Sequence, residues 1–206
     1  MDVSGREVGE ILGLGQSQTT RLLASGLAGP GHRRGRSVLY DAAAVAALRD
    51  RPLVTEETPL PPACGDGVLL ARVDPRGAEP GAWRELASGP WRLAFSRVLV
   101  LLVMRSTGPV PLVATVAGFV LGGAEVIDGR HTPEATTFEL AEPGDWFDAF
   151  SDTRVPAGPG EPLLFWRCRW SAPMGHRRTT GLPVLGPVPP RHLRPVRPAR
   201  PRATAG

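Results

Sequence analysis

The stretch that decides the fold of the first part of the chain is Ser4-Gly5-Arg6-Glu7-Val8-Gly9-Glu10-Ile11-Leu12-Gly13-Leu14. A serine followed three residues later by glutamate is the pattern of a capping box, in which each side chain bonds the backbone N–H of the other residue. The apolar residues Val8, Ile11 and Leu12 recur at offsets of three and four, which places them on one face of a helix. Gly13 then interrupts the pattern, because glycine readily takes a positive φ. The stretch therefore predicts a capped helix that ends in a tight turn.

Three further elements are expected before residue 51. A second helix is predicted over residues 16–25, where inward-facing leucines recur and a glycine follows. Two short extended runs divided by a glycine predict a β-hairpin over residues 31–40. Asp41 can cap a third helix over residues 42–49, which a proline closes. We therefore expect residues 1–51 to form one small domain.

The rest of the chain has a different texture. Residues 52–67 carry turn and extended signals with little apolar pattern, so they are predicted to be a linker. Residues 68–182 predict a mixed α/β domain dominated by β structure. Residues 183–206 are rich in proline and arginine and cannot supply a core, so we expect a disordered tail. The predicted fold class is α+β: an N-terminal domain, a mixed, β-rich α/β domain and a disordered Pro/Arg-rich tail.

The elements of the second domain are predicted from short apolar runs. A short helix is expected over residues 82–87, and a glycine-broken pair of strands within residues 113–126. Four more strands are expected over residues 68–73, 98–104, 136–140 and 163–170. All five tryptophans and all six phenylalanines lie in this domain. We interpret them as core residues, with a ligand pocket or a protein interface as the alternative.

The charge is distributed unevenly along the chain. Residues 1–60 hold seven arginines and seven acids, residues 61–170 hold ten arginines and thirteen acids, and residues 171–206 hold seven arginines and no acid. The net charge of +4 and the high isoelectric point are therefore properties of the tail. Basicity alone does not identify a nucleic-acid-binding domain. The tail could add non-specific DNA affinity through counterion release, or it could be an inert extension.

Several function classes find no support in the sequence. Cys64 and Cys168 lie in unlike contexts, so neither a disulfide framework nor a zinc site is predicted. The acidic run from Glu139 to Asp152 lacks the alternating ligands of a calcium loop and is interpreted as a solvated face. No phosphate-binding glycine motif and no catalytic constellation can be assembled. We therefore predict a protein that is not an enzyme and has no metal or cofactor.

The localisation is predicted from two absences. The first residues lack a basic segment followed by an apolar core, so the sequence does not predict a signal peptide. No run approaches the roughly 18 to 20 apolar residues that a spanning helix needs. We expect a cytoplasmic protein that has no membrane partner.

The N-terminal quarter resembles the winged helix-turn-helix of MerR-type regulators and excisionase-like proteins. The helix-turn-helix part of the resemblance is carried by Glu7-Val8-Gly9-Glu10-Ile11-Leu12-Gly13-Leu14, Ser17, Arg21-Leu22-Leu23 and Gly26-Leu27. Arg36, Tyr40-Asp41 and Val45-Ala46-Ala47-Leu48 stand where the family places its wing arginine, its strand-ending aromatic and its closing helix. The resemblance implies a domain that binds double-stranded DNA.

Two positions depart from the family pattern. Gly15 stands where a hydroxyl residue commonly precedes the recognition helix, and glycine is a less specific cap. Thr19 stands where the helix normally carries an aliphatic side chain. We therefore expect looser packing between the two helices than in the family at large.

The candidate DNA-binding residues follow from the resemblance and from docking geometry. A recognition helix enters the major groove by its N-terminus, so its early exposed residues meet base edges. Glutamine can pair with adenine, and arginine with guanine or phosphate. Gln16 and Gln18 are the only side-chain amides in the chain. The candidates are Gln16, Ser17, Gln18, Thr20 and Arg21 on the helix, and Arg33, Arg34, Arg36 and Tyr40 on the wing.

The sequence thus predicts a sequence-specific transcriptional regulator. One small module covers few base pairs, so a dimer or a cooperative array is expected. The second half would serve oligomerisation or sensing, with no effector identified. One alternative is an excisionase-like or nucleoid-architectural protein, and another is a ligand receptor or enzyme domain that the reader localises to DNA.

Overall fold

The computed structural model describes residues 1–65, 67–94, 98, 101, 108–156 and 161–166. The chain divides into two compact units, residues 1–171 and 172–206. The described residues all belong to the first unit. The tail predicted from residue 183 lies outside the described residues.

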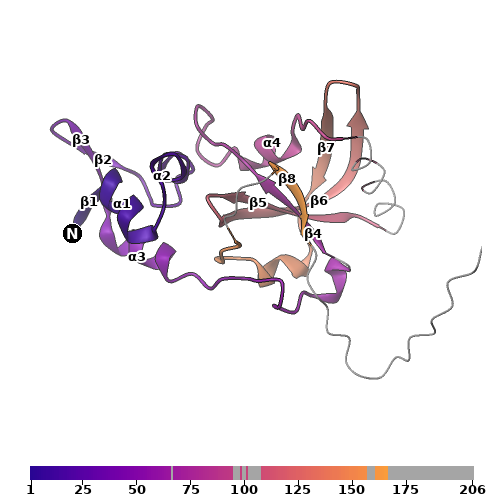
Figure 1. Ribbon diagram of the computed structural model, residues 1–206, viewed down its shortest axis with the longest axis horizontal. Helices are drawn as coiled ribbons and strands as arrows, with labels where there is room; N and C mark the ends of the chain where they lie inside the picture. The colour runs from indigo at the N-terminus through magenta and orange to yellow at the C-terminus, as the bar shows by residue number, and fades with distance from the viewer. Residues whose placement is uncertain (66, 95–97, 99–100, 102–107, 157–160, 167–206) are drawn as a thin grey trace, which may run out of the picture. The chain divides into compact units, whose positions relative to one another are not determined.

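The first 50 residues form three short helices and a small sheet (Figure 1). The elements in chain order are β1 (Asp2–Ser4), α1 (Gly5–Leu12), α2 (Gln16–Ala24), β2 (His32–Arg34), β3 (Ser37–Asp41) and α3 (Ala42–Arg49). The predicted capping box begins α1: Ser4 N donates to Glu7 Oε2 over 2.6 Å, and Glu7 N donates to Ser4 Oγ over 3.4 Å. Gly13 ends the helix with a φ of 65°. The predicted helix and turn are confirmed.

The small sheet has one strand more than the sequence indicates. Its order is β1-β3-β2, and both pairs are antiparallel. The predicted hairpin is formed by β2 and β3, and Gly35 at its turn has a φ of 65°. β1 has three residues, too few to carry an alternating pattern. It pairs with residues 39–41 of β3 on the side opposite to β2, so the base of the hairpin is attached to the domain by backbone pairing.

The helices α1 and α2 approach closely through Gly9. A Cβ atom on Gly9 would lie 2.7 Å from Oγ1 of Thr19, so any larger residue would force Thr19 or its helix to shift. Thr19 is buried, and its hydroxyl donates to the carbonyl oxygen of Gly15 over 3.1 Å. Gly9 thus leaves room for Thr19, whose hydroxyl is satisfied within its own helix. The expectation that the two helices pack more loosely than in the family stays a prediction.

The segment predicted as a linker is packed for part of its length. Val54 and Cys64 are buried, and residues Pro62–Cys64 form the short 3-10 helix η1. Val54 N donates to the carbonyl oxygen of Arg154 over 2.7 Å, next to an isolated bridge between Leu53 and Arg154. This segment continues the core of the second half.

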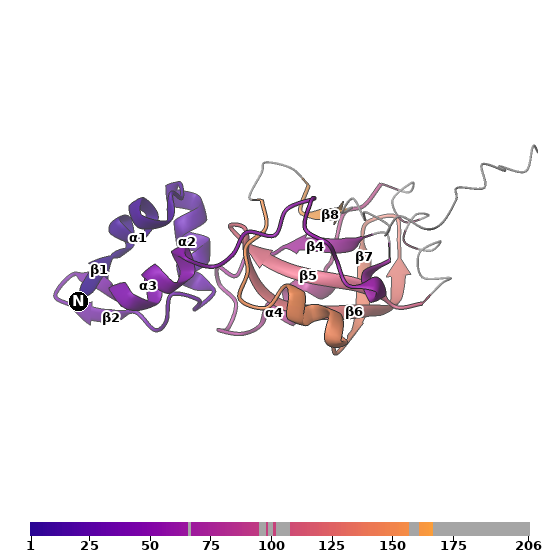
Figure 2. The ribbon, with the colours of Figure 1, turned by 90° about the horizontal axis from the view of Figure 1, so that it is seen from below.

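The second half is built on a mixed five-stranded sheet with the order β7-β6-β5-β4-β8. Its elements are β4 (Val68–Arg72), α4 (Trp83–Ser88), β5 (Val110–Val116), β6 (Phe119–His131), β7 (Thr136–Ala141), the 3-10 helix η2 (Asp145–Ala149) and β8 (Leu163–Trp166). β4 and β5 run parallel, and Figure 2 shows them side by side. The other three pairs are antiparallel. The coarse prediction of an α+β chain with a mixed, β-rich second half is confirmed.

The strand predicted over residues 98–104 is wrong at the two positions that the structure describes. Most of residues 98–104 lie outside the described residues, but Val98 and Leu101 are helical. The parallel pair β4 and β5 needs a crossover between its strands, and a helix is the usual form of one. A short apolar run does not distinguish a buried strand from a buried helix.

The glycine-broken pair of strands is confirmed as the β5–β6 hairpin, but the break is at residues 117 and 118. Ala117 and Gly118 have φ values of 51° and 88°. Gly122 and Gly123 lie inside β6, where an added Cβ would collide with the rings of Trp83 and Phe147, respectively. These two glycines therefore make room for aromatic rings.

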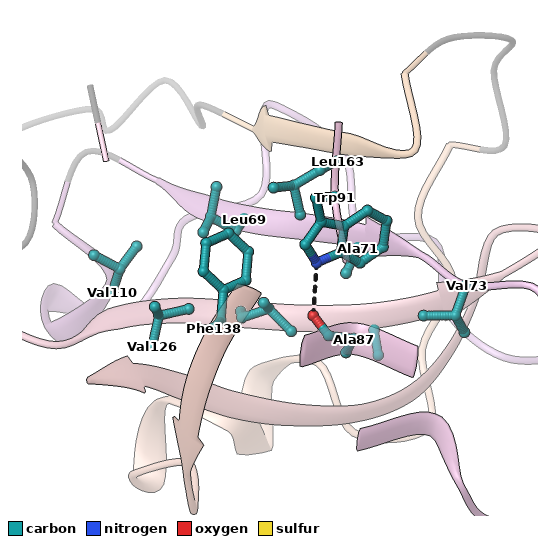
Figure 3. Close-up of a cluster of buried hydrophobic side chains, with 11 residues drawn as sticks. Leu69, Ala71, Val73, Ala87, Trp91, Val110, Val126, Phe138 and Leu163 are labelled. Carbon is teal, nitrogen blue, oxygen red and sulfur yellow. Dashed lines mark hydrogen bonds between the residues drawn. The ribbon is translucent and has the colours of Figure 1, made fainter. Parts of the chain in front are cut away.

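Both faces of the large sheet are covered. One cluster contains Leu69, Ala71 and residues of α4, and Trp91 Nε1 donates there to the carbonyl oxygen of Ala87 over 2.9 Å (Figure 3). The other contains Val68, Leu70 and residues of η2. Alternate residues of β4 thus enter opposite cores, as the two-residue period of a strand requires.

A third cluster joins the two halves of the unit. It contains Val8, Leu22 and Val45 from the three N-terminal helices together with Val116 and Phe119 from the β5–β6 hairpin. The two halves therefore share apolar packing in addition to a covalent connection.

Candidate nucleic-acid interface

The first turn of α2 is exposed and carries no acidic residue. Gln16, Ser17 and Thr20 are exposed, as the sequence predicts. The Thr20 hydroxyl donates to the carbonyl oxygen of Gln16 over 2.9 Å, within the helix. The first backbone N–H groups of a helix have no partner inside it, and they carry the positive end of the helix dipole. This end of α2 therefore offers polar side chains and backbone donors that suit an anionic partner.

Gln18 differs from Gln16 in exposure and in its contacts. Its side chain is half-buried, and its Oε1 accepts a hydrogen bond from Gly15 N over 3.2 Å. Glycine has no side chain with which to cap the helix, and Gln18 supplies the side-chain acceptor for the Gly15 N–H. The predicted exposure is therefore corrected for Gln18, whose oxygen is already engaged.

Arg21 is also half-buried and lies beside a residue of the second half. Its Nε is 3.2 Å from Oδ2 of Asp74, and the two side chains are 42% and 41% exposed. That Nε makes no hydrogen bond of acceptable geometry, so the contact is an ion pair. Asp74 also binds Arg76, which donates from Nε to Oδ1 over 2.8 Å. Arg21 is therefore not the free cation that the sequence indicates.

The Asp74 carboxylate is held in its charged form. Its pKa is lowered from the ordinary aspartate value, chiefly by the side-chain hydrogen bond from Arg76, with smaller contributions from the Arg76 backbone and the Arg21 charge. The sequence contains no signal for this contact. Asp74 and Arg76 lie 53 and 55 positions after Arg21, in a turn without a motif.

The β2–β3 hairpin carries three exposed arginines. Arg33 and Arg34 lie on β2, and Arg36 lies in the turn after Gly35. Among the residues that the structure describes, no carboxylate lies within ion-pair distance of any of the three. The hairpin thus presents unneutralised guanidinium groups. In Figure 1 it extends away from the three helices.

The base of the hairpin is fixed by residues that face the domain. His32 Nε2 lies 3.2 Å from Oδ2 of Asp2 on β1. Tyr40 is half-buried against the N-terminal core, and its ring lies so close to Gly31 that an added Cβ would be 3.0 Å from Cε1. Tyr40 therefore packs its ring against the domain at the base of the hairpin, and its predicted contact with DNA stays a prediction.

The described residues contain no group of three or more histidine, cysteine or acidic side chains that could hold a metal ion. Glu139, Glu142 and Asp145 of the acidic run are exposed, as are Asp148 and Asp152. Within the described part of the chain, no helix is long and apolar enough to cross a membrane.

Comparisons with protein-family models, with curated proteins and with solved structures found no match. The candidate interface therefore rests on the residues and contacts described above.

Proposed function

We propose that residues 1–51 form a winged helix-turn-helix of the MerR type that binds double-stranded DNA. In this proposal α2 enters the major groove by its N-terminus, and the β2–β3 hairpin contacts the backbone or the minor groove. The observation that carries it is the hairpin's set of exposed arginines, Arg33, Arg34 and Arg36, which lack carboxylate partners in the described structure. Guanidinium groups on a narrow hairpin suit phosphate contacts and insertion into a narrow minor groove.

The first turn of α2 supports the same proposal. Gln16, Ser17 and Thr20 are exposed on a helix whose first turn lacks acids. A glutamine side chain can donate to and accept from adenine at once. A hydroxyl can donate to or accept from a base edge, or donate to a phosphate. Base readout is therefore assigned to α2 and backbone positioning to the hairpin.

The whole chain would then act as a sequence-specific transcriptional regulator, with the second half serving oligomerisation or sensing. One module of this size contacts few base pairs, so two or more copies on repeated half-sites would give useful specificity. After α3 the described chain forms the Leu53–Arg154 bridge and does not continue as a helix on which a second copy could pack. Self-association would therefore use the sheet-containing half.

The proposal is tested by selecting duplexes from a random-sequence DNA pool with the full-length chain, followed by protection mapping on the selected duplex. We expect a short enriched motif, repeated at a spacing of about one helical turn if a dimer binds. Mapping of binding sites in cells would distinguish three roles. A regulator would bind a few promoter sites, an excisionase-like protein would bind one attachment site, and a nucleoid-architectural protein would cover the genome broadly. If the full-length chain retained no duplex DNA at low salt, the proposal would be overturned.

A further inference from the structure

We propose that Arg76, in the turn after β4, is a further DNA-contacting residue that binds a backbone phosphate beside α2. The inference rests on the proposed function, because it extends the same interface with a residue of the second half. Nothing in the resemblance of the N-terminal quarter reaches this position, which lies beyond residue 51.

The contact that places Arg76 beside α2 is a shared carboxylate. Oδ2 of Asp74 lies 3.2 Å from Arg21 Nε and 2.5 Å from a terminal nitrogen of Arg76. The two arginine nitrogens are therefore within about 6 Å of each other, a separation that two donors on one acceptor atom impose. The side chain of Arg76 is 49% exposed. A cation of the second half thus stands next to a candidate residue of the recognition helix.

The turn that carries Arg76 is anchored to the large sheet. Val73 and Pro75 on either side of Asp74 are buried, and Val73 N donates to the carbonyl oxygen of Thr115 over 2.9 Å. The turn is closed by Ala78 N, which donates to the carbonyl oxygen of Pro75 over 3.1 Å. A fixed turn lowers the entropy that an exposed side chain loses when it binds a partner. Arg76 is therefore held in place before DNA arrives.

The charge balance of this group favours an anion. Two guanidinium groups face one carboxylate, so one positive charge remains without a counterpart in the trio. A phosphate that approached Arg76 would meet this excess charge, and α2, which carries Arg21 in its last turn, contains no acidic residue. Arginine binds a phosphate through its planar fork of N–H donors, which can serve an aspartate and a phosphate together.

A purely local role for Arg76 is the competing explanation, since it could do no more than hold its own turn through Asp74. Lysine separates the two roles. It lacks the planar fork that binds both oxygens of Asp74, but it carries the same charge to a phosphate. Arg76→Lys is therefore expected to keep most of a phosphate contact and to lose the local one.

The experiment measures binding of the full-length chain to a mixed-sequence duplex of about 30 base pairs, by fluorescence anisotropy from about 50 to 200 mM salt. We expect Arg76→Ala to make the slope of log K against log salt shallower by about 1, which is the loss of one phosphate contact. Arg76→Lys should restore most of that slope. A thermal melt of each variant checks that the chain remains folded.

The matched control is Arg130→Ala, which removes an exposed arginine from the same half. Arg130 lies in the last part of β6, eleven residues beyond Phe119, which is the β6 residue that packs with the N-terminal helices. It should leave the slope unchanged. Equal slopes for Arg76→Ala and the parent chain, or an equal loss in Arg130→Ala, would overturn the inference while the DNA-binding proposal stands. Absence of any DNA binding by the parent chain would overturn both.

Discussion

The β2–β3 hairpin and the second half of α2 both carry arginine, but their electrostatic situations differ. Arg33, Arg34 and Arg36 stand on an exposed hairpin with no carboxylate in ion-pair distance among the described residues. Arg21 is half-buried and faces Asp74. A cation without a partner can meet a phosphate at once, whereas a paired cation must first exchange one anion for another. The hairpin should therefore supply affinity, and Arg21 should contribute less than its charge suggests.

The largest expected effect comes from removing the hairpin charges together. The triple variant Arg33→Ala, Arg34→Ala and Arg36→Ala should make the slope of log K against log salt shallower by about 2.7, if each arginine contacts one phosphate. The measurement is a salt titration with a mixed-sequence duplex. Because the side chains are exposed, the thermal melting temperature should stay near that of the parent chain.

The matched control for the hairpin variant is Arg6→Ala on α1, where the arginine is exposed but paired with Glu10 over 3.0 Å. It should change the slope by much less than one third of the triple effect. A hairpin variant that kept the parent slope would exclude the hairpin from the interface and leave α2 and Arg76 as the proposed contacts.

The next effect concerns Arg21. Arg21→Ala should weaken binding to a selected duplex by about tenfold, the low end for an arginine that contacts a base or phosphate. The loss is reduced because the parent chain must first separate Arg21 from Asp74. Competition titrations with selected and mixed-sequence duplexes measure it. Unchanged binding to both duplexes would show that Arg21 serves only the contact between the two halves.

The pairing of Arg21 and Arg76 with Asp74 has a signature in acid stability. The pKa of Asp74 is lowered in the folded chain, chiefly by the Arg76 hydrogen bond, so the folded state binds fewer protons at this carboxyl than the unfolded state. Its contribution is present above the ordinary aspartate pKa and is lost as the pH falls through the lowered value.

Thermal melts at about pH 5 and about pH 3 should therefore show a smaller drop for Asp74→Asn than for the parent chain. The effect is modest, because the carboxylate is 41% exposed and solvent screens the pair. The same drop in both proteins would mean that Asp74 is not paired in solution.

The N-terminal domain shows which features the sequence encodes locally. The capping box of Ser4 and Glu7, the αL glycine at Gly13 and the capping aspartate Asp41, which accepts from Ala43 N over 3.1 Å, each act within a few residues. The periodic pattern and the caps could therefore be read without knowledge of the tertiary structure. β1 could not, because a three-residue strand exists only through its pairing with β3.

The second half shows where local reading fails. Val98 and Leu101 are helical although their apolar run also suits a strand, and Gly122 is needed only because Trp83 packs there. The ion pair between Arg21 and Asp74 joins distant segments that share no pattern. Such features depend on tertiary contacts, which override local propensity. The candidate residues on α2 were therefore predicted by position, but their partners were not.

The smallest expected effect separates the two glutamines of α2. Gln18 caps its own helix through Gly15 N, so Gln18→Ala should lower the free energy of unfolding by about 0.5 kcal/mol, as loss of a weak helix cap does. Gln16 is exposed, so Gln16→Ala should leave stability unchanged. Urea denaturation of both variants tests this difference.

The same pair tests base readout, since each variant removes one amide from the same turn. Gln16→Ala should relax the base preference at one position of the selected motif, whereas Gln18→Ala should leave the motif intact and weaken all duplexes alike. Repeating the selection with each variant distinguishes these outcomes. If Gln18→Ala instead changed the motif, Gln18 would have to leave Gly15 when DNA binds. The helix α2 would then give up its own cap to contact a base, as we propose that Arg21 gives up Asp74.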